Sequence, residues 1–151
     1  MSSLNALIEQ EIALISRFIS VLQEEQDTLK HARIADLPAL TADKSRLVDQ
    51  LNTLEDERLA MLGLDRQPGA MEAWLKTHGT EQPAAALWRS LLELARRAKT
   101  LHDLNARLLD MHARQTSELL AALTQQGDRP ALYSANGQTQ TASGSRIIDS
   151  A

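Results

Sequence analysis

The sequence predicts an all-α protein, an elongated antiparallel helical bundle or coiled coil with three main helices and one short helix. Leucine and alanine supply most of the apolar residues of the 151-residue chain, whereas aromatic residues make up only 3%. Leucine and alanine favour helices, and strands favour β-branched and aromatic side chains. Apolar residues also recur at alternating gaps of four and three, which is the spacing of one helix face.

The first two long helices are predicted over residues 3–33 and 37–62. Asp36 is a candidate N-cap of the second helix, Pro38 fits its first turn, and Gly63 fits the position just after its end. Because the connection is very short, we expect the two helices to pack as an antiparallel hairpin. The stripe of the first helix contains Ile8, Ile12, Ile15, Ile19, Leu22 and Leu29. That of the second contains Leu40, Leu47, Leu51, Leu54 and Met61, with Lys44 and Arg58 in register.

A short helix is predicted near residues 69–78, with Met71, Trp74 and Leu75 turned inward to cap the end of the hairpin. The last helix is predicted over residues 83–126, on the order of 60 Å at ~1.5 Å per residue. Since the first two helices are shorter, part of the last helix must extend beyond them. If that part is C-terminal, the leucines near its end have no intramolecular cover: Leu119, Leu120 and Leu123.

Polar residues interrupt the apolar stripe of the last helix at Asn105, His112 and Gln115. A polar residue on a seam lowers stability but can fix the register of the helices. Asn105 either lies at the edge of the bundle and meets water, or Asn105 and Gln115 mark where the helix faces a partner. The pattern leaves both interpretations open.

The composition changes after Gly127. We therefore expect a helical domain over residues 1–126 and a flexible polar tail over residues 127–151, which is rich in Gly, Ser, Thr and Gln. The tail contains two apolar islands, residues 131–133 and the pair Ile147 and Ile148. That pair is either solvated, or the tail folds back onto the last helix of the same or a neighbouring molecule and competes with a partner.

The sequence offers no catalytic set. No two of its four histidines have the i, i+4 spacing of a helical metal site, and there is no glycine-rich phosphate loop. The acidic runs at 24–27 and 55–57 are interpreted as solvated helix faces. We therefore expect no enzyme, no metal and no cofactor.

Charge and cysteine content also limit the partners and the compartment. The net charge of −4 is spread along the chain, which argues against nucleic acid, and the chain has no cysteine, which fits a reducing cytosol. The N-terminal segment lacks a basic n-region, and Glu9 and Glu11 interrupt its apolar residues. We therefore expect neither a signal peptide nor membrane insertion.

Several segments occur in an order that resembles a known family. An amphipathic first helix is followed by DLPAL (36–40) with TADKSRLVDQL, by a long helix containing LHDLNARLLDMHARQTSELLAAL, and by LYSANGQT (132–139). The last segment is similar to a tyrosine–small–x–x–Gly segment. In this order they resemble the FlgN family of flagellar type III export chaperones.

The resemblance implies a cytosolic binding protein. It would hold hook–filament junction (hook-associated) subunits unpolymerised through their disordered C-terminal segments and deliver them to the export gate. Carried over from the family, Leu108, Met111, Leu119, Leu120 and Leu123 would line the client surface. Tyr133 would lie in the segment implicated in docking to the gate, although the tail here departs from the family in being phenylalanine-poor and serine-rich.

Two other classes of function remain open. A self-associating coiled-coil protein without a client, a homodimer through the last helix or the tail, would explain the same apolar stripe. A helical enzyme or metal-binding bundle is the second alternative, and the sequence provides no residues for it.

Overall fold

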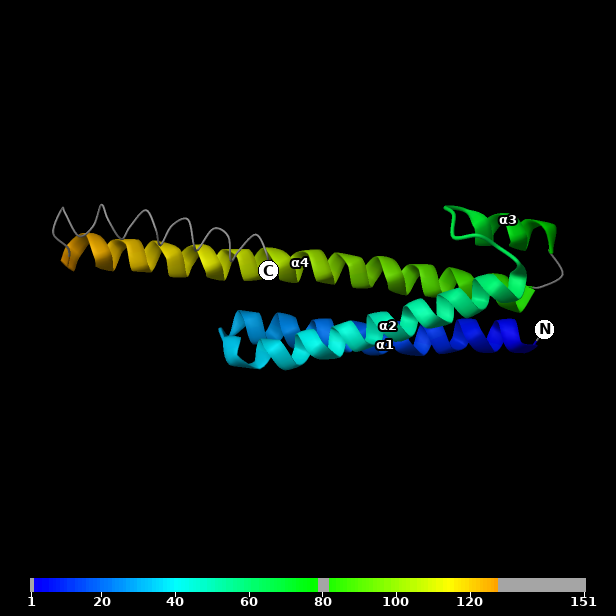
Figure 1. The fold of residues 1–151 in the computed structure, drawn as a ribbon, viewed down its shortest axis with the longest axis horizontal. Helices are drawn as coiled ribbons and strands as arrows, with labels where there is room; N and C mark the ends of the chain where they lie inside the picture. Colours follow the sequence, from blue (N-terminus) through cyan, green and yellow to red (C-terminus); the bar gives the residue numbers. More distant parts are fainter. Residues whose placement is uncertain (1, 79–81, 128–151) are drawn as a thin grey trace. The chain divides into compact units, whose positions relative to one another are not determined.

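The computed structural model describes residues 2–78 and 82–127, and every regular element in these residues is helical (Figure 1). The elements are α1 (Ser2–Lys30), the 3₁₀ turn η1 (Ile34–Asp36), α2 (Leu37–Leu62), α3 (Ala70–Thr77) and α4 (Gln82–Gly127). The all-α prediction is confirmed. The chain divides into two units, residues 1–104 and the part from Asn105 onward, and each is described by itself.

The first helix ends at Lys30, three residues before the predicted end. Ala32 adopts a left-handed conformation with φ of 55°. The amide of Arg33 donates to the carbonyl of Thr28 at 2.9 Å, and that of Ala32 to the carbonyl of Leu29 at 3.2 Å. These two bonds form a Schellman motif, which satisfies the last carbonyls of the helix and turns the chain out of it.

The second helix begins and ends at the predicted residues, but its first turn is not capped by a side chain. Asp36 has helical dihedral angles and its side chain makes no capping hydrogen bond, because the η1 turn leads directly into the helix. Asp36 therefore occupies the predicted N-cap position, but its helical backbone keeps its side chain from capping the free amides. Pro38 does occupy the first turn, and Gly63 ends the helix in the left-handed region with φ of 66°.

Within residues 1–104, α1 and α2 run antiparallel, and the first part of α4 runs in the same direction as α1 (Figure 1). One apolar cluster joins the start of α1 to α3 and the start of α4, with a buried set of Leu4, Ile8, Met71, Ala84 and Leu91. A second cluster lies further along α1 and α4 and contains Ile19, Leu22 and Ala98. The predicted inward faces of α1 and α3 are therefore confirmed.

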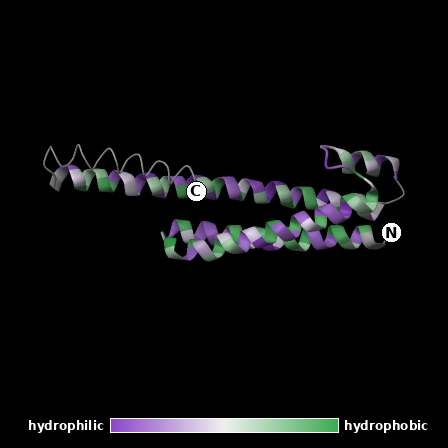
Figure 2. Cartoon of the chain, viewed as in Figure 1, coloured by the Kyte–Doolittle hydropathy of each residue, from purple (hydrophilic) through white to green (hydrophobic). Residues whose placement is uncertain are grey.

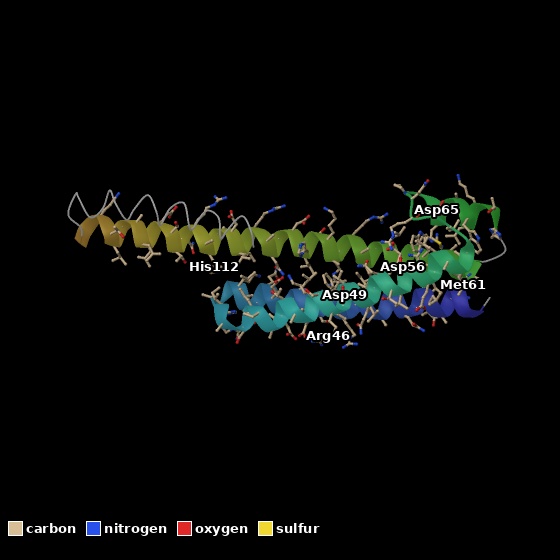
Figure 3. The ribbon with its side chains drawn as sticks, in the orientation of Figure 1. Arg46, Asp49, Asp56, Met61, Asp65 and His112 are labelled. Atoms are coloured by element: carbon tan, nitrogen blue, oxygen red, sulfur yellow. The ribbon has the colours of Figure 1, made fainter. Side chains whose placement is uncertain are left out.

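Met61 departs from the predicted stripe of α2. It is 43% exposed in the last turn of the helix, where Figure 3 labels it. The next residue, Leu62, packs against the first cluster in its place. Ile15 and Leu101 are half-buried against the clusters, whereas Leu47 is fully buried.

Among the described helices, none combines the length and the apolar character that a membrane span needs.

Candidate partner-binding surface

The last part of α4 exposes large apolar side chains. Between 43% and 59% of the surface of each is accessible at Leu109, Met111, Leu119, Leu120 and Leu123. Apolar residues recur along α4 as far as its C-terminal end (Figure 2). Exposed apolar residues that form a continuous set mark an interaction surface more often than isolated ones do.

Helix geometry places four of these side chains on one face. At about 100° per residue, Leu109, Leu119, Leu120 and Leu123 fall within an arc of about 100°, the width of an amphipathic stripe. We call these four residues the leucine face. Met111 lies outside this arc, so it does not share one flat contact with them. Leu108 adjoins the arc and is half-buried, and Gln115 is exposed.

The remaining predicted partner residues divide into two groups. Asn105 is only 2% exposed, so the interpretation that it meets water at the edge of the bundle is wrong. Its contact with a partner stays a prediction. Tyr133, Ile147 and Ile148 lie outside the described residues.

A buried ion pair joins α1 to α2, and the sequence did not reveal it. Nε of Arg58 donates to Oε1 of Glu11 at 2.7 Å, and Nη2 donates to Oε2 at 3.3 Å. Each residue is 4% exposed. Burial raises the pKa of Glu11 above its usual range, and the hydrogen bonds and charge of Arg58 offset this only in part. Arg58 stood in register on the predicted stripe of α2, which was the one signal of this pair.

A second ion pair corrects the interpretation of residues 24–27 as a solvated face. Glu25 is 7% exposed, and its carboxylate accepts a hydrogen bond from Nζ of Lys44 at 2.7 Å. Lys44 also stood in register on the stripe of α2. Both charged positions on that stripe therefore contact carboxylates of α1, which fixes how the two helices align.

Trp88 extends the polar contacts of Arg58 to α3 and α4. The guanidinium carbon of Arg58 lies 4.6 Å from the centroid of the Trp88 ring, a cation–π contact. Nε1 of Trp88 donates to Oε2 of Glu72 at 2.6 Å. Arg66, in the connection after α2, pairs with Glu55 at 2.9 Å and with Asp56, which Figure 3 labels. None of these contacts was predicted, because in each of them the two residues lie in different predicted segments of the chain.

The described residues bring together no group of three metal-ligating side chains. The leucine face is an accessible set of apolar side chains on one side of α4. Comparison with known proteins gives that surface a context. The model of a protein family, described as FlgN protein, matches residues 1–141, which is nearly the whole length of the chain. No curated protein and no solved structure matches it. The chain belongs to the FlgN family, a family of flagellar export chaperones.

Proposed function

We propose that this protein is a cytoplasmic chaperone for hook–filament junction (hook-associated) subunits, which it keeps unpolymerised and delivers to the export gate. Membership of the FlgN family supports a role in flagellar export in general. The observation that carries the finer proposal is the leucine face, which gives α4 an accessible apolar stripe. The proposed unit of function is the helical domain of residues 1–126, with residues 127–151 as a polar tail.

The client binds as an amphipathic helix along this stripe. Its C-terminal segment is disordered when free and orders on binding, so apolar anchors at i, i+3, i+4 and i+7 meet the leucine face. Leu108 extends this contact, and Gln115 supplies a hydrogen-bonding group beside it. Met111 adds a contact from a neighbouring face of the helix. Asn105 also belongs to the predicted contact set, but at 2% exposed it is accessible to a client only if the residues that cover it move.

The tail carries two further proposed roles. Tyr133 contributes to docking at the export gate. Ile147 and Ile148 contact the leucine face in the absence of a client, because a segment tethered this close has a high effective concentration. Replacing both isoleucines with serine should therefore raise the affinity for a client peptide, whereas replacing Tyr133 with alanine should weaken binding to the gate and leave client binding unchanged.

The test of the client surface is a calorimetric titration with C-terminal peptides of hook-associated subunits. The double variant Leu120→Ser, Leu123→Ser should bind at least about tenfold more weakly, because two apolar anchors are lost. Val48→Ser is the matched control, since Val48 is an exposed apolar residue of α2 with 40% of its surface accessible. Equal affinities of the double variant and the control would contradict the proposal.

A second candidate function rests on the same exposure, because the leucine face also fits a second copy of the chain. Sedimentation over a range of protein concentrations separates the two. A tight dimer that Leu120→Ser disrupts, and that does not bind the client peptides, would favour a self-associating structural protein.

A further inference from the structure

A cavity of about 360 Å³ opens in the first unit, and none of the residues of the leucine face lines it. It lies where the end of α2, the connection to α3, α3 itself and the start of α4 meet. Its apolar wall includes Leu59, Pro68, Ala70 and Met71, and Arg58 and Trp88 also line it. This volume is at the lower end of the ~300–1,000 Å³ range of binding pockets, enough for one large side chain and its peptide group.

Arg58 brings an unused donor to this cavity. Glu11 engages Nε and Nη2, and within the described residues Nη1 makes no hydrogen bond. Nη1 is not fully enclosed by the protein. It therefore reaches accessible space, although Arg58 as a whole is only 4% exposed. A largely buried guanidinium with free N–H groups at a cavity is suited to an oxygen acceptor from another molecule.

The charges around the cavity decide which acceptor fits. The positive charge of Arg58 is opposed by Glu11, and that of Arg66 by Glu55 and Asp56. Glu72, which accepts the hydrogen bond from Trp88, adds a further negative charge at the rim. Two acids, Glu55 and Glu72, and two bases, Arg58 and Arg66, line the cavity, and each base is already paired with an acid. No net positive charge is left to bind a carboxylate, and the surroundings favour a neutral carbonyl oxygen.

We propose that this cavity is a second docking site, which takes an apolar side chain of a protein partner together with the neighbouring main-chain carbonyl. The side chain packs against Leu59 and Met71, and the carbonyl accepts from Nη1 of Arg58. That the partner is a protein rests on the family assignment, since export chaperones act on proteins. The site does not depend on client binding at the leucine face, and the two can fail separately.

The first test uses N-acetyl-L-leucinamide, the smallest probe with both a leucine side chain and neutral carbonyls. The full chain is labelled with ¹⁵N, and its two tryptophan indole signals are followed by NMR during the titration. The Trp88 signal should shift and saturate, because Trp88 lines the cavity. Trp74, which packs in the first cluster and does not line the cavity, should stay unmoved. A Trp88 signal that never saturates, or equal shifts at both tryptophans, would overturn the proposal.

Variants and a second probe assign the contacts. N-acetylglycinamide, which lacks the side chain, should bind at least about tenfold more weakly. Arg58→Lys keeps a positive charge opposite Glu11 but has no second nitrogen to replace the Nη1 donor, and should weaken binding of the leucine probe about threefold to tenfold.

The filling variant Ala70→Trp occupies the cavity from its rim and should abolish the Trp88 response. It carries the test alone if Arg58→Lys fails to fold. Val48→Ser, at an exposed position of α2 that does not line the cavity, is the matched control and should bind the probe as the unchanged chain does. Full probe binding by Ala70→Trp would overturn the site, whatever the result of the client titration.

Discussion

The two parts of α4 share one apolar spacing and differ in burial. In the first part, Ala84, Leu91 and Ala98 are buried against the start and middle of α1. In the second part, Leu119, Leu120 and Leu123 keep the spacing but expose more than half of their surface. The apolar spacing therefore shows which face of a helix is suited to packing. It does not show whether another helix of the same chain covers that face.

Charged residues follow the same division. On α2, Arg58 and Lys44 interrupt an apolar stripe and find carboxylates on α1. In the second part of α4, the described ion pair of Arg114 and Asp110 joins neighbours on one helix at 2.6 Å, with both side chains well exposed. Such a surface pair contributes little to stability, whereas breaking a buried pair is costly.

The largest expected effect comes from breaking the buried pair of the first unit. Glu11→Leu leaves the guanidinium of Arg58 buried without its acceptor and should lower the free energy of unfolding by about 3–5 kcal/mol. Urea denaturation followed by circular dichroism measures this. Glu9→Leu, at an exposed position of the same helix, should change stability by less than about 0.5 kcal/mol.

The double variant Glu11→Leu, Arg58→Met should recover most of the loss, because it removes both charges together. A loss in Glu11→Leu no larger than that in Glu9→Leu would show that the ion pair contributes nothing.

Leucine truncation compares the two parts of α4 directly. Leu91→Ala should lower the free energy of unfolding by about 2–4 kcal/mol, because Leu91 is 7% exposed and the truncation leaves a cavity. Leu120→Ala should cost less than about 0.5 kcal/mol, since its side chain is already in contact with water. Thermal and urea unfolding measure both.

One position in each of the three long helices extends this comparison: Ile15 in α1, Leu47 in α2 and Leu101 in α4. Leu47→Ala should behave like Leu91→Ala, whereas the half-buried Ile15 and Leu101 should give losses of about 1–2 kcal/mol. Equal losses for Leu91→Ala and Leu120→Ala would mean that the leucine face is covered within the molecule.

Glu11 also predicts a dependence of stability on pH. Its pKa in the folded protein is raised above the usual 4.5, chiefly by burial, with Arg58 lowering it and Glu55 raising it further. From pH 4.5 up to the raised pKa, the folded state binds more protons than the unfolded chain. The contribution of Glu11 to the free energy of unfolding is therefore greatest below this window and falls as the pH rises through it.

The measurement is a series of urea unfolding curves over about pH 4 to 8, for the unchanged chain and for Glu11→Gln. The advantage of the unchanged chain over the variant should shrink as the pH rises. An advantage that grows with pH would mean that Arg58 outweighs burial and lowers the pKa of Glu11 instead.

The smallest expected effect concerns the end of α1. Ala32 has φ of 55°, which is strained for a residue with a side chain. Ala32→Gly should raise the free energy of unfolding by about 0.5 kcal/mol, because the relief of strain is partly offset by the greater freedom of glycine in the unfolded chain. Ala42→Gly, at an exposed position inside α2, should lower it by about 1 kcal/mol. Stabilities that fall in both variants would contradict the strained conformation.

Local signals predicted most of the fold. Gly63, Pro38 and the four-three spacing each act within a few residues, so the bounds of α2 and α4 agree with the structure to within one residue. The end of α1 was placed too late because the left-handed residue there is an alanine, and alanine gives no sign of a helix end. The exposure of Leu119 and Leu120 was predicted only on the condition that the C-terminal part of α4 extends beyond the other helices, and both are exposed.

The contacts between distant segments could not be predicted. Glu11 and Arg58 are 47 positions apart, and Glu25 and Lys44 are 19 apart. A single sequence shows a charge on an apolar stripe but not which opposite charge reaches it. The cavity beside Trp88 has the same origin, because its walls come from three helices and a connection whose alignment only the folded chain defines.

Because α1 packs against both α2 and α4, its apolar residues are completed in two stages as the chain leaves the ribosome. The hairpin of α1 and α2 is complete once Leu62 has emerged, but Leu4 and Ile8 also require Ala84 and Leu91. Roughly 30 residues separate Leu62 from Leu91, which at about 5–20 residues per second leaves a delay of about 1.5–6 s. During this delay the hairpin presents one apolar side of α1 to the cell. The first apolar surface that this protein must shield during its synthesis is therefore its own.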